Sequence, residues 1–168
     1  MCKLFLICPE CFSEQELINE FGEESYFLTS LGAIFDQDND THTANIQHLV
    51  STLPIEEVCI FQSTDCNFIN QNFNAGEAKI GLPTEKSFAS DYRSLVKQSV
   101  VSISPLDRKL ELAKLNLSRQ MAFASQVISD FNNSTTKKRT LIGVIYGEGK
   151  KLSDRKIIQK IENKSTHR

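Results

Sequence analysis

Residues 58–66 read Val-Cys-Ile-Phe-Gln-Ser-Thr-Asp-Cys, an apolar run that ends in a polar turn containing a thiol. A similar run, Leu-Phe-Leu-Ile-Cys-Pro-Glu-Cys, occupies residues 4–11. Short continuous apolar runs are typical of strands in a parallel sheet whose two faces are both covered. If the two strands are neighbours, their carboxyl ends meet at one edge of the sheet, and the two turns form one metal or thiol centre. Neither turn contains a histidine.

The composition is that of an ordinary globular protein, since 40% of the 168 residues are hydrophobic and 24% are charged. We expect a single domain over residues 1–168, with a basic tail from about residue 150. A formal net charge of -2 gives no electrostatic reason to expect a nucleic-acid or membrane partner. No apolar run approaches the roughly 20 residues of a membrane span, and residues 1–8 lack the features of a secretory signal. Five cysteines cannot all pair within one chain, so we expect a reducing compartment, the cytoplasm.

Apolar runs alternate with helical patterns along the chain. The runs predict strands over residues 3–8, 26–31, 57–61 and 141–146. Apolar residues that recur every three or four positions predict helices over residues 42–53 and 105–131. Glu14 and Glu16 favour the start of a helix over residues 13–21, and a further helix is expected over residues 87–98. The basic tail is expected to carry one short helix, with Ile157, Ile158 and Ile161 on one side. The alternation predicts an α/β three-layer sandwich with a mainly parallel sheet of four or five strands.

The order of these motifs resembles that of the β-class carbonic anhydrases. That family has a strand ending in Cys-x-Asp-x-Arg, a second with an Arg-Asn-Ala-Gly turn, and a third followed by His-Thr-Asp-Cys-Gly. The corresponding segments here are residues 6–12 (Leu-Ile-Cys-Pro-Glu-Cys-Phe), 28–32 (Leu-Thr-Ser-Leu-Gly) and 63–67 (Ser-Thr-Asp-Cys-Asn). Residues 111–116 with Gln120 resemble the family's long helix, and residues 141–146 its final strand. The likeness covers roughly residues 3–148 and implies a β-carbonic-anhydrase-like fold.

The resemblance also implies a zinc site, which the family builds from two thiolates and one imidazole. Zinc in such a site acidifies a bound water for attack on carbon dioxide. Cys8 and Cys66 match the two thiolate ligands, whereas Ser63 replaces the histidine with a hydroxyl that is a poor zinc ligand. Glu10 replaces the motif aspartate, and Phe12 replaces the arginine that pairs with it. The resemblance therefore implies a carbonic-anhydrase-like protein that lacks the ordinary hydration of carbon dioxide.

Zinc remains a candidate cofactor, held by Cys8 and Cys66 with some of Cys11, Glu10 and Asp65. Cys11 completes a Cys-x-x-Cys spacing with Cys8, as in half of many zinc sites. Glu10 and Asp65 are also the candidate catalytic residues. The alternative is that Cys8 and Cys66 are only small, buried apolar residues.

His42 follows the second predicted strand, so it is either a proton carrier or substitute ligand at the site, or a surface residue in a polar loop.

Three other functions stay open, and the sequence does not decide whether the chain is an enzyme. A replacement ligand would allow a zinc-dependent lyase or hydrolase that acts on a small molecule such as carbon dioxide. Residues 8–11, Cys-Pro-Glu-Cys, would suit a thiol redox protein. A site without catalysis would suit a binding or scaffold protein for a small molecule or anion. The resemblance also implies a homodimer.

Overall fold

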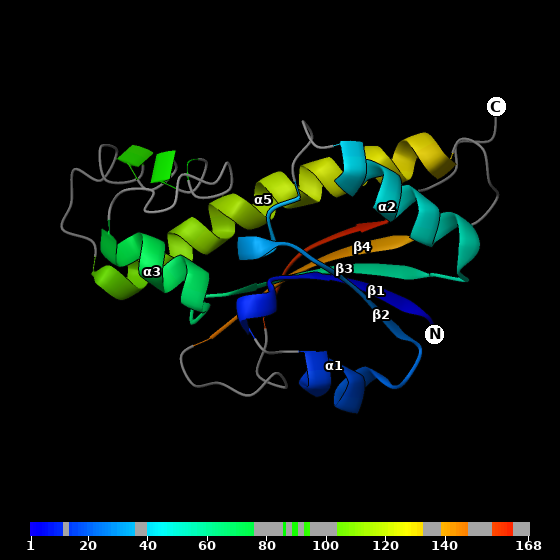
Figure 1. Cartoon of the computed structure of the whole chain (residues 1–168), viewed down its shortest axis with the longest axis horizontal. Helices are drawn as coiled ribbons and strands as arrows, with labels where there is room; N and C mark the ends of the chain where they lie inside the picture. The colour runs from blue at the N-terminus through cyan, green and yellow to red at the C-terminus, as the bar shows by residue number, and fades with distance from the viewer. Residues whose placement is uncertain are drawn as a thin grey trace.

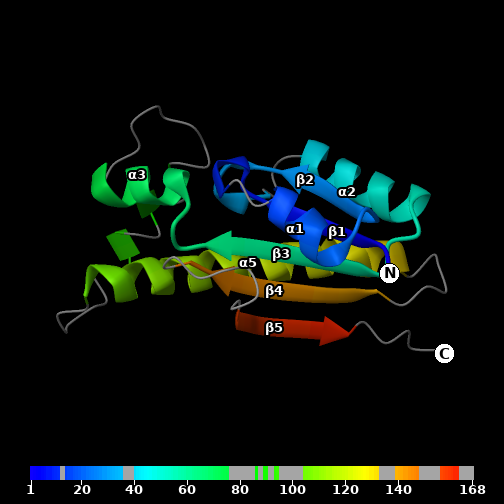
Figure 2. The same ribbon diagram turned by 90° about the horizontal axis from the view of Figure 1, so that it is seen from below.

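The computed structural model describes residues 1–11, 14–35, 40–75, 86, 89–90, 93–94, 104–132, 139–147 and 156–162. Its centre is a five-stranded sheet with the strand order β2-β1-β3-β4-β5 (Figures 1 and 2). Four strands pair in parallel, namely β1 (Lys3–Ile7), β2 (Ser25–Thr29), β3 (Glu57–Ser63) and β4 (Thr140–Tyr146). β5 (Lys156–Glu162) pairs antiparallel with β4. The prediction of a mainly parallel sheet is confirmed.

Helices cover both faces of this sheet. α2 (Asp40–Thr52) and α5 (Pro105–Asn132) lie on one face, and α1 (Glu14–Phe21) lies on the other (Figure 1). α3 (Asn67–Ala75) begins beyond the carboxyl end of β3. The arrangement is the predicted three-layer α/β sandwich. None of the described helices is long and apolar enough to cross a membrane.

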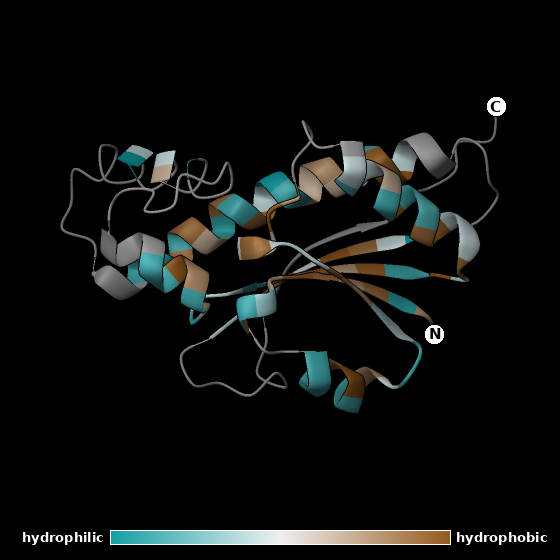
Figure 3. Ribbon diagram, in the orientation of Figure 1, coloured by the Kyte–Doolittle hydropathy of each residue, from teal (hydrophilic) through white to brown (hydrophobic). Residues whose placement is uncertain are grey.

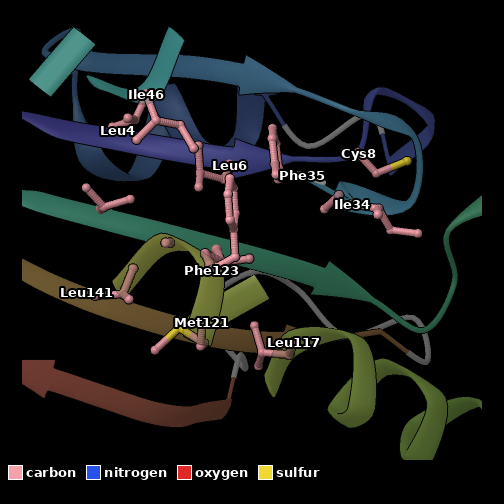
Figure 4. Close-up of a cluster of buried hydrophobic side chains, with 14 of the residues drawn as sticks. Leu4, Leu6, Cys8, Ile34, Phe35, Ile46, Leu117, Met121, Phe123 and Leu141 are labelled. Atoms are coloured by element: carbon pink, nitrogen blue, oxygen red, sulfur yellow. The ribbon is translucent and has the colours of Figure 1, made fainter. Parts of the chain in front are cut away.

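The two covered faces explain why the strands are apolar along their whole length. Successive side chains of a strand point to opposite faces of the sheet. Leu4 and Leu6 of β1 join a large core cluster with side chains of α2 and α5, whereas Phe5 and Ile7 join a smaller cluster with α1. The middle of the sheet is correspondingly hydrophobic (Figure 3). Cys8 belongs to the large cluster and lies at its end, just beyond β1 (Figure 4).

The basic tail forms a strand where the sequence predicted a helix, so that prediction is wrong. β5 pairs with β4 from Thr140 to Ile145, with an irregularity between Gly143 and Val144. The isoleucine spacing in the tail fits one face of a helix, but β-branched residues also favour strands. Pairing with β4 favours the strand over the helix, because the edge of β4 offers the tail a row of backbone hydrogen-bonding groups.

The other predicted elements that the structure describes are found within about two residues of their predicted ends; β3 runs two residues further than predicted, to Ser63, and α2 begins two residues earlier, at Asp40. The second strand stops at Thr29, two residues earlier than predicted, because Leu31–Ala33 form a 3-10 turn. The helix predicted over residues 87–98 lies mostly outside the described residues, of which 89–90 and 93–94 are helical.

Candidate metal centre

Three cysteine side chains meet at the carboxyl edge of the sheet. Cys8 directly follows β1, and Cys66 lies in the turn between β3 and α3. β1 and β3 are parallel neighbours, so their ends bring the two residues together. The Sγ atoms of Cys8 and Cys66 are 3.3 Å apart, and the Sγ atoms of Cys8, Cys11 and Cys66 all lie within 4.8 Å of one another. All three are free thiols.

Cys11 reaches this cluster through a tight turn. Pro9–Cys11 form a 3-10 helix, and the Cys11 N–H donates to the Cys8 carbonyl oxygen at 3.1 Å. A 3-10 helix has three residues per turn, so side chains three positions apart lie above one another. The Cys-x-x-Cys spacing therefore places the side chains of Cys8 and Cys11 on the same side of the turn.

The cluster concentrates negative charge on the Cys8 sulfur. Hydrogen bonds from the thiols of Cys11 and Cys66, and from the backbone N–H groups of Glu10 and Gly32, lower the pKa of Cys8 to about 3 despite its burial. The pKa of Cys11 is raised by its hydrogen bonds with Cys66 and Cys8 and by burial. For Cys66 the hydrogen bond with Cys11 lowers the pKa, but the bond to Cys8, burial and the Cys8 charge together raise it to about 12. Of the three thiols, Cys8 is therefore the one whose surroundings favour the thiolate.

The backbone of the 3-10 turn Leu31–Ala33 supports Cys8. The Gly32 N–H donates to Cys8 Sγ at 3.1 Å. Gly32 has a φ of 67°, and a Cβ atom there would lie 3.0 Å from two ring atoms of Phe68. Glycine satisfies both the left-handed backbone and the close approach. This glycine is the one residue of the Arg-Asn-Ala-Gly motif that the chain keeps.

Two side chains for which no role at the site was predicted hold this turn. Gln62 Nε2 and Asn116 Nδ2 both donate to the Gly32 carbonyl oxygen, at 3.2 Å and 2.9 Å. Both side chains are buried. The sequence offered no clear signal for either residue, because Gln62 begins the polar turn after the apolar run and Asn116 lies close to the polar residues Lys114, Ser118 and Gln120.

The predicted carboxylates do not belong to the thiol cluster. Ser63 is buried, and its Oγ accepts a hydrogen bond from the Asp65 N–H at 3.1 Å, which fixes the turn before Cys66. The Asp65 side chain is exposed. Within the part of the chain that the structure describes, the convergent group of metal-binding atoms includes neither the Glu10 nor the Asp65 carboxylate. Phe12 lies outside the described residues.

His42 lies in the first turn of α2 and is not part of that convergent group. Its ring meets the Phe35 ring edge-on, with the ring centroids 5.4 Å apart. His42 is half-buried and lies in a helix, where the sequence left a polar loop open; a role as proton carrier stays a prediction.

Solved structures share this architecture. The chain matches the β-carbonic anhydrase CafA of Aspergillus fumigatus with a TM-score of 0.69 and 18% identity, over 94% of this chain and 74% of the other. It matches the Coccomyxa β-carbonic anhydrase, solved with acetazolamide, with a TM-score of 0.70 and 16% identity, over 95% and 72%. A tetrameric β-carbonic anhydrase of Sordaria macrospora gives a TM-score of 0.70 and 12% identity, over 95% and 81%. The chain has the β-carbonic anhydrase fold. No family model and no curated protein matches the sequence.

On this β-carbonic anhydrase fold, the donor set present suits a zinc ion. Zinc–sulfur bonds of about 2.3 Å in a tetrahedral site place the sulfurs about 3.8 Å apart. The Cys8–Cys66 separation of 3.3 Å, and the 4.8 Å limit that holds for all three sulfurs, bracket that value. Thiolates are soft ligands that favour zinc over the hard cations magnesium and calcium. Three protein ligands also leave a fourth position open, as in catalytic zinc sites.

Proposed function

We propose that the protein is a β-carbonic-anhydrase-like zinc protein whose ion is held by the thiolates of Cys8, Cys11 and Cys66. The observation that carries the proposal is the convergence of these three sulfurs at the edge of the sheet. In this proposal the Cys11 thiolate takes over from the imidazole, for which the chain has Ser63.

We further propose that hydration of carbon dioxide at neutral pH is lost. Bound zinc supplies Lewis acidity, but three thiolates carry one more negative charge than two thiolates and a neutral imidazole, and that charge weakens the acidity of the ion. The aspartate–arginine pair of the family motif is also replaced by Glu10 and Phe12, and neither the length of glutamate nor the apolar ring reproduces it. The open position then takes a small molecule or an anion.

The assembly and compartment belong to the proposal as well. We expect a homodimer, which light scattering on the purified protein would test. Five free cysteines are consistent with a reducing compartment such as the cytoplasm. Thiol redox activity is not favoured, because the Cys-x-x-Cys turn lies on the β-carbonic anhydrase fold and not on a thioredoxin-like fold.

Metal analysis tests the proposal. Untagged protein purified without chelator is expected to contain close to one zinc per chain, and the variants Cys8→Ser, Cys11→Ser and Cys66→Ser are expected to lose it. Cys59→Ser is the matched control, because Cys59 is a buried cysteine in β3 that does not belong to the cluster. Zinc that persists in all three variants, or is absent from the wild type, would refute the zinc centre.

The hydration assay is a separate measurement. We expect no acceleration by the zinc-loaded wild type at neutral pH. Acceleration that Cys66→Ser abolishes would instead establish a zinc-dependent lyase with a replacement ligand.

A further inference from the structure

We propose that Gln62 and Asn116 are positioning residues of the metal centre, because their amides hold the Gly32 turn so that its N–H donates to the Cys8 sulfur. The hydrogen bonds that Gln62 and Asn116 donate to Gly32 do not involve the cysteines, so both residues act on Cys8 through Gly32. The effect on zinc rests on the proposed function, whereas the effect on the Gly32 turn does not.

The Gly32 carbonyl oxygen accepts two side-chain hydrogen bonds. Gln62 of β3 donates at 3.2 Å and Asn116 of α5 donates at 2.9 Å. A carbonyl oxygen has two lone pairs, so the two amides satisfy it fully. The donors come from the sheet and from the covering helix, and the Gly32 turn is therefore fixed against two separate layers of the fold.

A third amide from α5 extends this arrangement. Gln120 lies one helical turn beyond Asn116, and its Nε2 donates to Asn116 Oδ1 at 3.4 Å. Its Oε1 accepts the Phe35 N–H at 2.8 Å, just after the Gly32 turn. The side chains of Gln62, Asn116 and Gln120 are all buried, and buried amides are costly unless they are paired. α5 thus holds the segment from Gly32 to Phe35 at both ends.

The backbone of the turn needs this support. Gly32 and Ala33 both have positive φ, at 67° and 51°, and Ala33 is the one non-glycine residue with positive φ among those described. Such a conformation persists only where surrounding contacts fix it. Without the two amide donors, the turn would relax, and the Gly32 N–H would no longer be aimed at Cys8 Sγ.

A hydrogen bond to a metal-binding sulfur orients the ligand and adjusts its donor strength. Partners of this kind behind metal ligands change metal affinity by about 10- to 100-fold when they are removed. We therefore expect the two amides to affect zinc affinity and not only the stability of the fold.

Two apolar replacements of similar size, Gln62→Met and Asn116→Leu, test the inference. Leu117→Ala is the matched control: Leu117 is the next residue of α5, is buried, and packs over Gly143 of β4 instead of the Gly32 turn. The control loses packing and stability but keeps both amides. Zinc affinity is measured by competition with a chromogenic chelator. The hydrogen-exchange rate of the Gly32 amide is measured by NMR and compared with that of the Ile60 amide of β3 in the same sample.

Both amide variants are expected to bind zinc more weakly than the wild type, by no more than the roughly 10- to 100-fold that loss of a direct partner of a ligand causes, with Leu117→Ala close to the wild type. In metal-free protein, Gly32 exchange is expected to accelerate about tenfold relative to Ile60 in the amide variants alone, as the loss of one buried hydrogen bond implies. Gly32 exchange that follows global stability equally in all three variants would overturn the inference. A wild type that binds no zinc would refute the proposed function and with it the role in a metal centre, and Gly32 exchange would then decide only whether the two amides hold the Gly32 turn.

Discussion

Replacing Gly32 with alanine measures the cost of the backbone that supports Cys8. The φ of 67° is left-handed, which costs a residue with a Cβ about 1–2 kcal/mol. The added methyl group would also lie 3.0 Å from two ring atoms of Phe68. Phe68 is buried in the large core cluster, so its ring cannot move without disturbing other side chains. Overpacking of this kind costs about 1–3 kcal/mol, and the expected loss in the free energy of unfolding is therefore about 2–5 kcal/mol.

Gly22→Ala separates the two contributions. Gly22 has a φ of 91° at the end of α1, but no atom outside its chain neighbours lies within 4 Å of a Cβ placed there. This variant should lose only the backbone contribution of about 1–2 kcal/mol. Urea unfolding of the wild type and both variants, compared at equal m-values, gives the difference directly. If Gly32→Ala costs no more than Gly22→Ala, the contact with Phe68 carries no energy and the reasoning fails.

Three further predictions concern metal binding and the core. Zinc affinity should rise about 100-fold per pH unit near neutrality, because the pKa of Cys8 is lowered whereas Cys11 and Cys66, whose pKa values are raised, must each lose a proton to bind zinc. Competition titrations at several pH values measure this slope. A zinc affinity that does not change with pH would contradict the prediction. Chelation should lower the Tm of the zinc-loaded wild type, because zinc at about 100 times its Kd stabilises the fold by about 2.7 kcal/mol. It should not change the Tm of Cys11→Ser, which is expected to bind no zinc. Equal Tm shifts in calorimetry would count against Cys11 as a ligand. Arg139→Met should lower the free energy of unfolding by about 1.5–3 kcal/mol, since it removes the buried guanidinium that donates to the Val50 carbonyl oxygen of α2. Urea unfolding measures this loss. An unchanged free energy would show that the hydrogen bond only offsets the cost of burying the charge.

The strands and the place of the site were predictable because both follow from short-range patterns. β1 and β3 read as continuous apolar runs, and the parallel pairing of such strands puts their carboxyl ends at one edge. Cys8 and Cys66 follow those ends, so their meeting required only that the strands be neighbours. The structure shows that they are.

The parts that the sequence could not predict depend on distant partners. Ile157, Ile158 and Ile161 fit a helix or a strand, and the edge of β4 selects the strand. The Gly32 carbonyl accepts hydrogen bonds from residues 30 and 84 positions away. No local pattern joins these positions, and polar neighbours in the sequence conceal that Gln62 and Asn116 are buried.

The difference between local and distant contacts also supports the proposal that a third thiolate stands in for an imidazole. A replacement ligand on another element would need a new long-range contact, whereas Cys11 needs only the 3-10 turn that begins after Cys8. Three sulfurs can therefore meet without any change in the sheet. The same donor set would add negative charge to the ion's surroundings, and the chain has Glu10 and Phe12 where the resembling motif has its aspartate and arginine. In the proposed centre, metal binding is therefore expected without carbon dioxide hydration.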